Sequence, residues 1–162
     1  MQRADLNGLR VCCLRTRTFW KGPMSVAETR ALIERYYFAF NEGDVHAMLD
    51  CLAPTVAHDV NQGPRRRGKK KFGEFLEHMN RCYRERLSDI AIMVSPDGSR
   101  AAAEFQLKGK YLTTDKGLPK AAGQTYRLSV AATFTVRDGR ITRIATHYNL
   151  ADWLAQVRGK SA

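Results

Sequence analysis

Residues 36–59 read YYFAFNEGDVHAMLDCLAPTVAHD, and this order predicts two helices followed by a strand. Apolar residues recur at helical spacing before and within this stretch, which predicts a first helix over 25–41. Gly43 stands just past that helix, where a left-handed backbone commonly ends one. A second short helix is expected over 45–52, and Pro54 ends it. A strand is then expected over 55–61.

This layout brings a phenol and a carboxylate onto neighbouring elements. Tyr36 lies on the apolar stripe of the first helix, and Asp59 lies within the strand. A tyrosine and an aspartate that face one apolar cavity suit proton transfer at a carbon next to a carbonyl, because burial strengthens the base and the phenol stabilises the enolate oxygen. Successive strand residues point to opposite sides, so only one of His58 and Asp59 is expected to face the cavity.

The rest of the chain predicts a third helix and then a run of hairpin-linked strands. The expected elements are a helix over 69–84, strands over 87–94, 101–112, 125–136 and 141–148, and a last short helix containing Trp153. Helices followed by hairpins in this order predict an α+β fold. In such a fold a strongly curved antiparallel sheet can wrap its concave face around the three N-terminal helices, and the space left between them is a natural apolar pocket.

Folded structure is expected to start near Met24. Ser25 and Glu28 have the spacing of a capping box, in which each side chain satisfies a free backbone N–H at the start of a helix. Residues 1–23 lack a sustained period and are interpreted as a disordered or over-called N-terminal extension. Because they are rich in arginine and poor in acids, a targeting peptide is the alternative. The domain is expected to span 24–158.

The chain has 162 residues, which suits one domain, and a formal net charge of +11. Residues 1–23 carry +4 and residues 65–71 carry +6, so the remaining chain carries only +1. This uneven charge, without interleaved aromatic residues, predicts no nucleic-acid partner. No apolar run approaches the roughly 20 residues that cross a bilayer, so no membrane partner is expected. The four cysteines lack paired C-x-x-C spacing, which predicts no metal site and a cytoplasmic location.

The basic run Arg65–Lys71 has two interpretations. If a helix starts near Gly68, three lysines occupy its first turn, where the helix dipole disfavours cations. One interpretation is capture of an anionic group at the mouth of the pocket. The other, which we favour, is a solvated loop, because runs of like charge usually lie in solvent.

Several segments resemble the NTF2-like superfamily and, within it, ketosteroid isomerases and SnoaL-like polyketide cyclases. The similar segments are ERYYFAFNEGDVHAML, HDVNQG, FLEHMNRCYRERLSDI, DGSRAAAEF, GKYLTTDKGLP and VRDGRITRIATHYNLADWL. More narrowly, the chain resembles the group called ketosteroid isomerase-related proteins. The resemblance implies a cone-shaped α+β fold, a small hydrophobic ligand, no cofactor, and pairing into homodimers, for which the 127–135 face is a candidate surface.

The resemblance also implies roles for particular residues. Tyr36, eight residues before Asp44, matches the catalytic tyrosine, and Asp59 matches the base, with His58 as an alternative. The second acid that holds the enolate oxygen in ketosteroid isomerases falls near Ala132 and is absent here. A substitute donor would then be needed. The residues expected to bind substrate or supply that donor are His58, Asn61, Tyr126, His147, Phe105 and Phe75.

The function expected from these residues is cofactor-independent isomerisation of a small hydrophobic carbonyl compound, with Asp59 carrying the proton and Tyr36 polarising the carbonyl. Two alternatives stay open. A related dehydratase or polyketide cyclase would use the same proton transfer. A non-catalytic domain that only binds a small molecule would explain the missing acid near Ala132.

Overall fold

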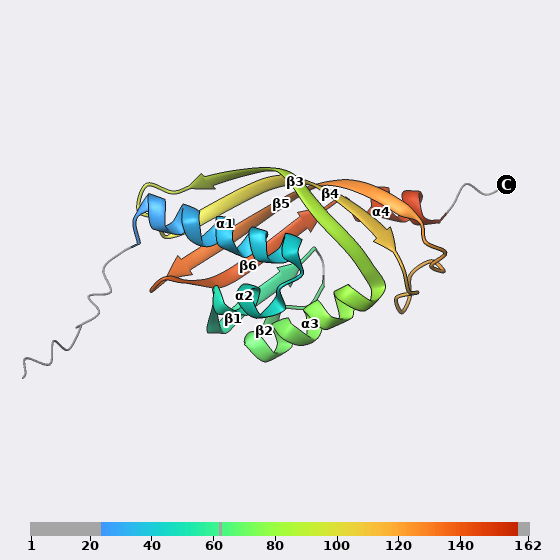
Figure 1. Cartoon of the computed structure of the whole chain (residues 1–162), viewed down its shortest axis with the longest axis horizontal. Helices are drawn as coiled ribbons and strands as arrows, with labels where there is room; N and C mark the ends of the chain where they lie inside the picture. The colour runs from blue at the N-terminus through green and yellow to red at the C-terminus, as the bar shows by residue number, and fades with distance from the viewer. Residues whose placement is uncertain (1–23, 62, 159–162) are drawn as a thin grey trace, which may run out of the picture.

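The computed structural model of the chain describes residues 24–61 and 63–158 (Figure 1). The expectation about residues 1–23 lies outside the described residues. The helices are α1 (Val26–Glu42), α2 (Val45–Asp50), α3 (Lys69–Cys82) and α4 (Leu150–Val157). The strands are β1 (Leu52–Val60), β2 (Arg66–Arg67), β3 (Tyr83–Val94), β4 (Arg100–Tyr111), β5 (Thr125–Arg137) and β6 (Arg140–Tyr148). The order of helices and strands confirms the expected α+β class.

Helix α1 starts and ends as its sequence predicts. The Ser25 side chain accepts from the backbone N–H of Glu28, and the Glu28 carboxylate accepts from Ser25, which completes the capping box. Gly43 ends the helix with φ of 70°, in the left-handed region that glycine adopts at little cost. The apolar stripe is buried against the sheet and includes Ile33 and Tyr36. Burial of this stripe fixes which side of α1 faces the sheet.

The six strands form one curved sheet in the order β2-β1-β6-β5-β4-β3. Figure 1 shows α1 crossing the concave face of this sheet, with α2 and α3 on the same side. Most neighbouring strands are antiparallel, as expected, but β1 pairs with β6 in parallel. A parallel pair requires a long connection, and here the whole segment from β2 to β5 provides it.

Three features of the fold differ from the sequence-based expectation. The proline at 54 lies inside β1, at the place where the register between β1 and β6 shifts and its missing N–H costs no ladder bond. The basic run contains the short strand β2, which pairs with β1, so it is not one uniform loop. Strand β3 begins at Tyr83 and not at Leu87, because the backbone becomes extended directly after α3.

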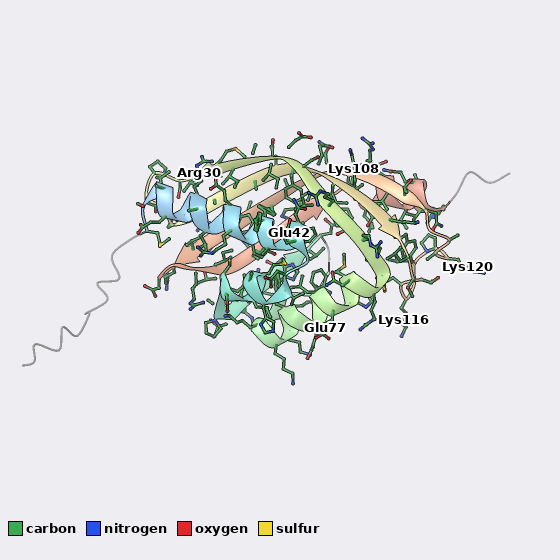
Figure 2. All side chains as sticks on the ribbon, in the orientation of Figure 1. Arg30, Glu42, Glu77, Lys108, Lys116 and Lys120 are labelled. Atoms are coloured by element: carbon green, nitrogen blue, oxygen red, sulfur yellow. The ribbon has the colours of Figure 1, made fainter. Side chains whose placement is uncertain are left out.

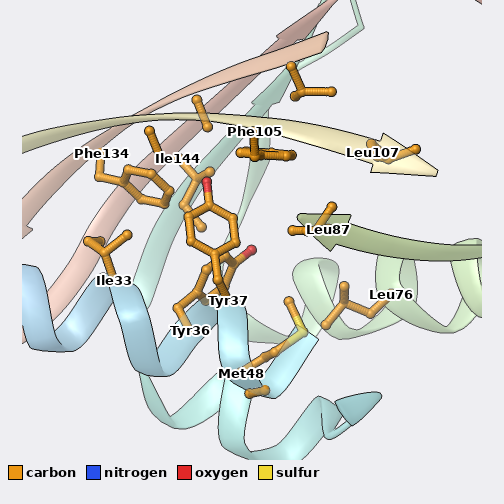
Figure 3. Packing of buried hydrophobic residues seen from close by; sticks show 14 of the residues in the cluster. Ile33, Tyr36, Tyr37, Met48, Leu76, Leu87, Phe105, Leu107, Phe134 and Ile144 are labelled. Atoms are coloured by element: carbon orange, nitrogen blue, oxygen red, sulfur yellow. The ribbon is translucent and has the colours of Figure 1, made fainter. Parts of the chain in front are cut away.

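Alternation along β4 and β5 builds the inner wall of the cone. In both strands buried residues alternate with exposed ones over nearly the whole length, as the period of two predicts. Buried aromatic side chains from α1 and from the sheet interdigitate in the space between the helix and the sheet (Figure 3). Charged side chains such as Arg30, Glu77 and Lys108 are exposed (Figure 2). Within the described ranges, no helix has the length and apolar character needed to cross a membrane.

Candidate functional site

A cavity of about 730 Å³ lies between the concave face of the sheet and the helices. Its wall is formed by α1, α3 and the inward-facing residues of the strands. Aromatic side chains line much of it: Tyr36, Tyr37, Phe40, Phe72, Phe75, Tyr83, Phe105, Tyr126, Phe134, Tyr148 and Trp153. A space of this size and lining suits an organic molecule of several rings.

Five of the eight residues that the sequence singled out line this cavity. They are Tyr36, His58, Tyr126, Phe105 and Phe75. The other three, Asp59, Asn61 and His147, are not among its lining residues. The structure therefore brings together most of the expected binding residues, but it separates Tyr36 from Asp59.

Asp59 points away from the cavity, which corrects its expected placement. Its Oδ1 accepts from Arg65 Nε at 2.7 Å, and its Oδ2 accepts from Arg143 Nη2 at 2.8 Å. The hydrogen bond from Arg65, together with that from Arg143, lowers the pKa of the Asp59 carboxyl to about 2. The physical reason for the placement is the strand alternation, because the neighbouring residue His58 faces inward and is only 4% exposed. A carboxylate held in this way is a poor base.

Asn61 and His147 also lie outside the cavity wall, each for a local reason. Asn61 adopts φ of 42° at the end of β1, and its Oδ1 accepts from the backbone N–H of Tyr148. It therefore holds the end of β1 against β6. His147 is exposed because Thr146 and Tyr148, the residues on either side of it, face the cavity.

Two tyrosines of α1 reach into the core beneath the sheet. Tyr36 and Tyr37 lie edge to face, with ring centroids 5.5 Å apart, and Tyr37 packs 5.1 Å from the ring of Phe105 (Figure 3). Burial raises the pKa of both phenols, so both stay protonated and can donate. The Tyr37 hydroxyl is buried and has no hydrogen-bond partner among the residues that the structure describes.

Three acidic residues line the cavity, Glu42, Glu85 and Asp115, and the sequence-based expectation included none of them. Glu42 is exposed, and the Asp115 carboxylate is bonded to His78 and Tyr83, so Glu85 is the candidate base. Tyr126 Oη donates to Glu85 Oε1 at 2.6 Å, and both residues line the cavity. Burial raises the pKa of Glu85, although the bond from Tyr126 acts in the opposite direction. A signal was present, because Tyr83, Glu85 and Leu87 share one face once the strand is allowed to start at Tyr83.

Gly109 makes the contact between Glu85 and Tyr126 possible. Gly109 on β4 is paired with Glu85 of β3 on one side and with Tyr126 of β5 on the other. A Cβ atom built at this glycine would lie 2.1 Å from Tyr126 Cζ. The absence of a side chain therefore lets the phenol ring lie across β4 and reach the carboxylate on the strand beyond.

At the other edge of the sheet, His58 is enclosed by aromatic rings. Its imidazole lies 4.6 Å from the Phe72 ring and 4.7 Å from the Phe75 ring, measured between centroids. Burial, together with the nearby Arg66 charge, lowers the pKa of His58 to about 4, so the imidazole is neutral at pH 7. The Arg66 guanidinium stacks 4.8 Å from the centroid of Phe75.

One group of side chains in the described ranges could in principle hold a metal ion. His78 Nε2, Cys82 Sγ and Asp115 Oδ2 lie within 4.8 Å of one another. Asp115 Oδ2 is already bonded to His78 and to the Tyr83 hydroxyl, both at 3.0 Å. Burial raises the pKa of the Cys82 thiol, which disfavours the thiolate that a metal needs. Hydrogen bonding accounts for the closeness of these groups, and we assign no metal to them.

Comparison with known proteins identifies the family. Residues 33–144 match the SnoaL-like domain. The chain belongs to the SnoaL-like family. This confirms the resemblance to the NTF2-like superfamily and the cone-shaped fold that it implied. A search of curated proteins gave no match.

Solved structures of two candidate polyketide cyclases are similar to this SnoaL-like protein over nearly their whole length. The one from Pseudomonas putida KT2440 is 53% identical with a TM-score of 0.78, and the alignment covers 83% of this chain and 98% of that chain. The one from Silicibacter sp. TM1040 is 49% identical with a TM-score of 0.80, with the same two shares covered. A phenazine biosynthesis-related protein from Pseudomonas aeruginosa, at 18% identity and a TM-score of 0.71 over 85% of this chain and 89% of that one, shares the fold alone.

Proposed function

We propose that this protein binds a hydrophobic carbonyl compound in its cavity and moves a proton at a carbon next to the carbonyl. The observation that carries the proposal is the Glu85 carboxylate in an aromatic cavity wall, with one oxygen bonded to Tyr126 at 2.6 Å. Isomerases and aldol-type cyclases both begin with this step. The likeness to candidate polyketide cyclases supports the cyclase outcome as much as the isomerase outcome.

In the proposed step, Glu85 Oε2 takes the proton from the α-carbon. The electron pair of that C–H bond forms a C=C bond, and the carbonyl oxygen becomes an enolate. With a β,γ-unsaturated ketone, return of the proton to the γ-carbon gives isomerisation. Attack of the enolate carbon on a second carbonyl instead closes a ring, and the alkoxide that forms takes the proton from Glu85. Tyr126 acts as a positioning residue because its hydroxyl is committed to Glu85.

The donor to the enolate oxygen is proposed to come from α1. The resemblance assigns this role to Tyr36, which lines the cavity, and its neighbour Tyr37 has a buried hydroxyl with no hydrogen-bond partner among the described residues. A buried phenol that gains an oxyanion partner stabilises the transition state in which that charge develops. The position of the missing second acid, Ala132, also lines the cavity and can supply no such bond.

Deuterium exchange tests the proposal without knowledge of the natural substrate. The full-length protein is incubated in D₂O with cyclic ketones such as 1-tetralone and 2-decalone, and α-deuteration is followed by mass spectrometry. Removal of a general base typically lowers a rate by about 10²–10⁴-fold, and we expect such a loss for Glu85→Gln. Glu104→Gln is the matched control, because Glu104 is exposed on the outer face of β4.

Asp59→Asn separates the structural proposal from the sequence-based one. If Glu85 is the base, Asp59→Asn keeps the exchange rate and Glu85→Gln loses it, whereas the opposite result would return the role to Asp59. The second candidate function is binding of a small molecule without catalysis. The ion pairs that hold Asp59 outside the cavity favour this candidate. Ketones that bind to the wild-type protein but show no accelerated exchange would establish that candidate.

A further inference from the structure

Two polar groups at the β1–β2 edge of the cavity lack partners. His58 Nδ1 and Arg66 Nη1 are both buried, and neither has a hydrogen-bond partner within residues 24–61 and 63–158. Both residues line the cavity, and His58 is only 4% exposed. Buried polar groups in folded proteins are nearly always hydrogen-bonded, and an unpaired charged donor is the costliest exception. These atoms therefore point to a bound group that completes them.

The two side chains are held next to each other by strand pairing and by a shared aromatic ring. His58 of β1 is directly opposite Arg66 of β2 in the antiparallel register. Both pack on Phe75, at 4.7 Å for the imidazole and 4.8 Å for the guanidinium carbon, measured to the ring centroid. The ring limits the motion of both groups and keeps them facing the cavity.

The charge at this edge is positive and unbalanced. Arg66 forms no salt bridge with any described residue, and the carboxylate of Asp59 is bound by Arg65 and Arg143 on the other side of β1. The imidazole is uncharged at neutral pH, so it offers one N–H donor and leaves the charge to Arg66. A cationic fork beside a neutral donor suits an oxyanion.

We infer that His58 and Arg66 form a subsite for an oxyanion group carried by a hydrophobic ring compound. The inference rests on the proposed function and names its substrate class: an elongated aromatic or polycyclic molecule with a carboxylate, sulfonate or enolate-type oxygen at one end. Glu85 lies on β3, at the opposite edge of the sheet from β1 and β2. The anionic end would therefore be anchored on one side of the cavity while a ring carbon faces Glu85 on the other.

A pair of fluorescent probes that differ only in the anionic group tests the subsite. The probes are 8-anilinonaphthalene-1-sulfonate and its neutral parent N-phenyl-1-naphthylamine, titrated against the full-length protein at fixed ionic strength. A hydrogen-bonded charge contact corresponds to about tenfold or more in affinity, so we expect Arg66→Gln to weaken binding of the sulfonate by that factor. Binding of the neutral probe should change less than about twofold, which also shows that the cavity is intact.

Arg67→Gln is the matched control, because it removes the same charge from the neighbouring, exposed position of β2. Arg66→Lys keeps the charge but loses the planar fork, and we expect an intermediate affinity for the sulfonate. Equal weakening by Arg66→Gln and Arg67→Gln, or equal loss of both probes with Arg66→Gln, would overturn the subsite. The probes report binding and not turnover, so that result would leave the exchange test of Glu85 unaffected. If neither probe bound the wild-type protein, the subsite and the proposed ligand-binding cavity would both be refuted.

Discussion

His58 is a buried histidine whose titration should limit stability in acid. Its pKa is lowered from 6.5 to about 4, chiefly by burial. Below pH 6.5 the unfolded chain takes up a proton at this residue while the folded protein does not, so stability is present above pH 6.5 and is lost as the pH falls toward 4. Over that interval the loss amounts to about 3 kcal/mol.

The change His58→Phe removes this titration while keeping an aromatic ring between Phe72 and Phe75. As the pH falls from 7 to 4, the wild type should lose about 3 kcal/mol of stability that the variant does not lose. The free energy of unfolding of the variant minus that of wild type should therefore rise by about 3 kcal/mol over this range. Urea denaturation at a series of pH values measures the difference, in which all other titrating groups cancel. A difference that does not vary with pH would mean that His58 is protonated normally in the folded state.

Deprotonation of Glu85 should raise the exchange activity of the protein and lower its stability. Burial raises its pKa above the usual value of 4.5. Its contribution to stability is therefore present below pH 4.5 and is lost as the pH rises through the folded-state value. The carboxylate is the active form of the base, so exchange activity should fall as the pH drops through that same raised value.

The change Glu85→Gln tests both statements. We expect the variant to gain thermal stability relative to wild type as the pH rises from 4 to 8, while its exchange activity is lost. Scanning calorimetry across this range measures the first effect, and Glu104→Gln provides the matched control on the outer face of the sheet. If the melting temperatures of Glu85→Gln and wild type kept a constant difference, the cavity would not be raising this pKa.

At the scale of elements, three neighbouring strands position the Glu85–Tyr126 pair through a glycine. Gly109→Ala would place a Cβ 2.1 Å from the Tyr126 ring, so the ring must move away from Glu85. We expect a loss of about 1–3 kcal/mol in the free energy of unfolding. We also expect exchange activity to drop, although neither Glu85 nor Tyr126 is itself changed.

Gly73→Ala is the matched control for that substitution. A Cβ at this position in α3 would meet Leu49 Cδ1 at 3.8 Å, an ordinary contact. Because alanine favours helix over glycine, the control should gain about 0.5–1 kcal/mol. Denaturation measures the stability of the two variants, and the deuterium-exchange assay measures their activity. Full activity in Gly109→Ala would show that the contact between Tyr126 and Glu85 is not needed.

For the whole molecule, the expected homodimer stays a prediction. The outer face of β5 presents the short, exposed side chains of Ser129, Ala131 and Thr133, which leave room for a second sheet to pack against it. We expect light scattering to give about twice the chain mass of 18.3 kDa. Ala131→Arg should shift the mass to that of the monomer, whereas Asp138→Arg, in the β5–β6 turn, should not. A wild-type protein at the monomer mass would refute the dimer.

Much of the fold could be predicted because local periodicity encodes it. The capping box at Ser25, the stop at Gly43 and the alternation along β4 and β5 depend on residues within a few positions of one another. The same periodicity predicted that Tyr36 would face the interior and that His58 and Asp59 would point opposite ways. The sequence by itself therefore determined most of the helices and strands and their buried faces, and its resemblance to a known family supplied the cone-shaped architecture.

Only the tertiary structure decided which side chains share the cavity. The choice of His58 over Asp59 follows from how β1 sits between β6, β2 and α3, and Asp59 then meets an arginine that is 84 positions away in the chain. The approach of Tyr126 to Glu85 depends on the register of three strands and on the exact residue where α3 gives way to β3. A shift of a single residue in that register would turn Glu85 outward, and no local pattern in the sequence excludes such a shift.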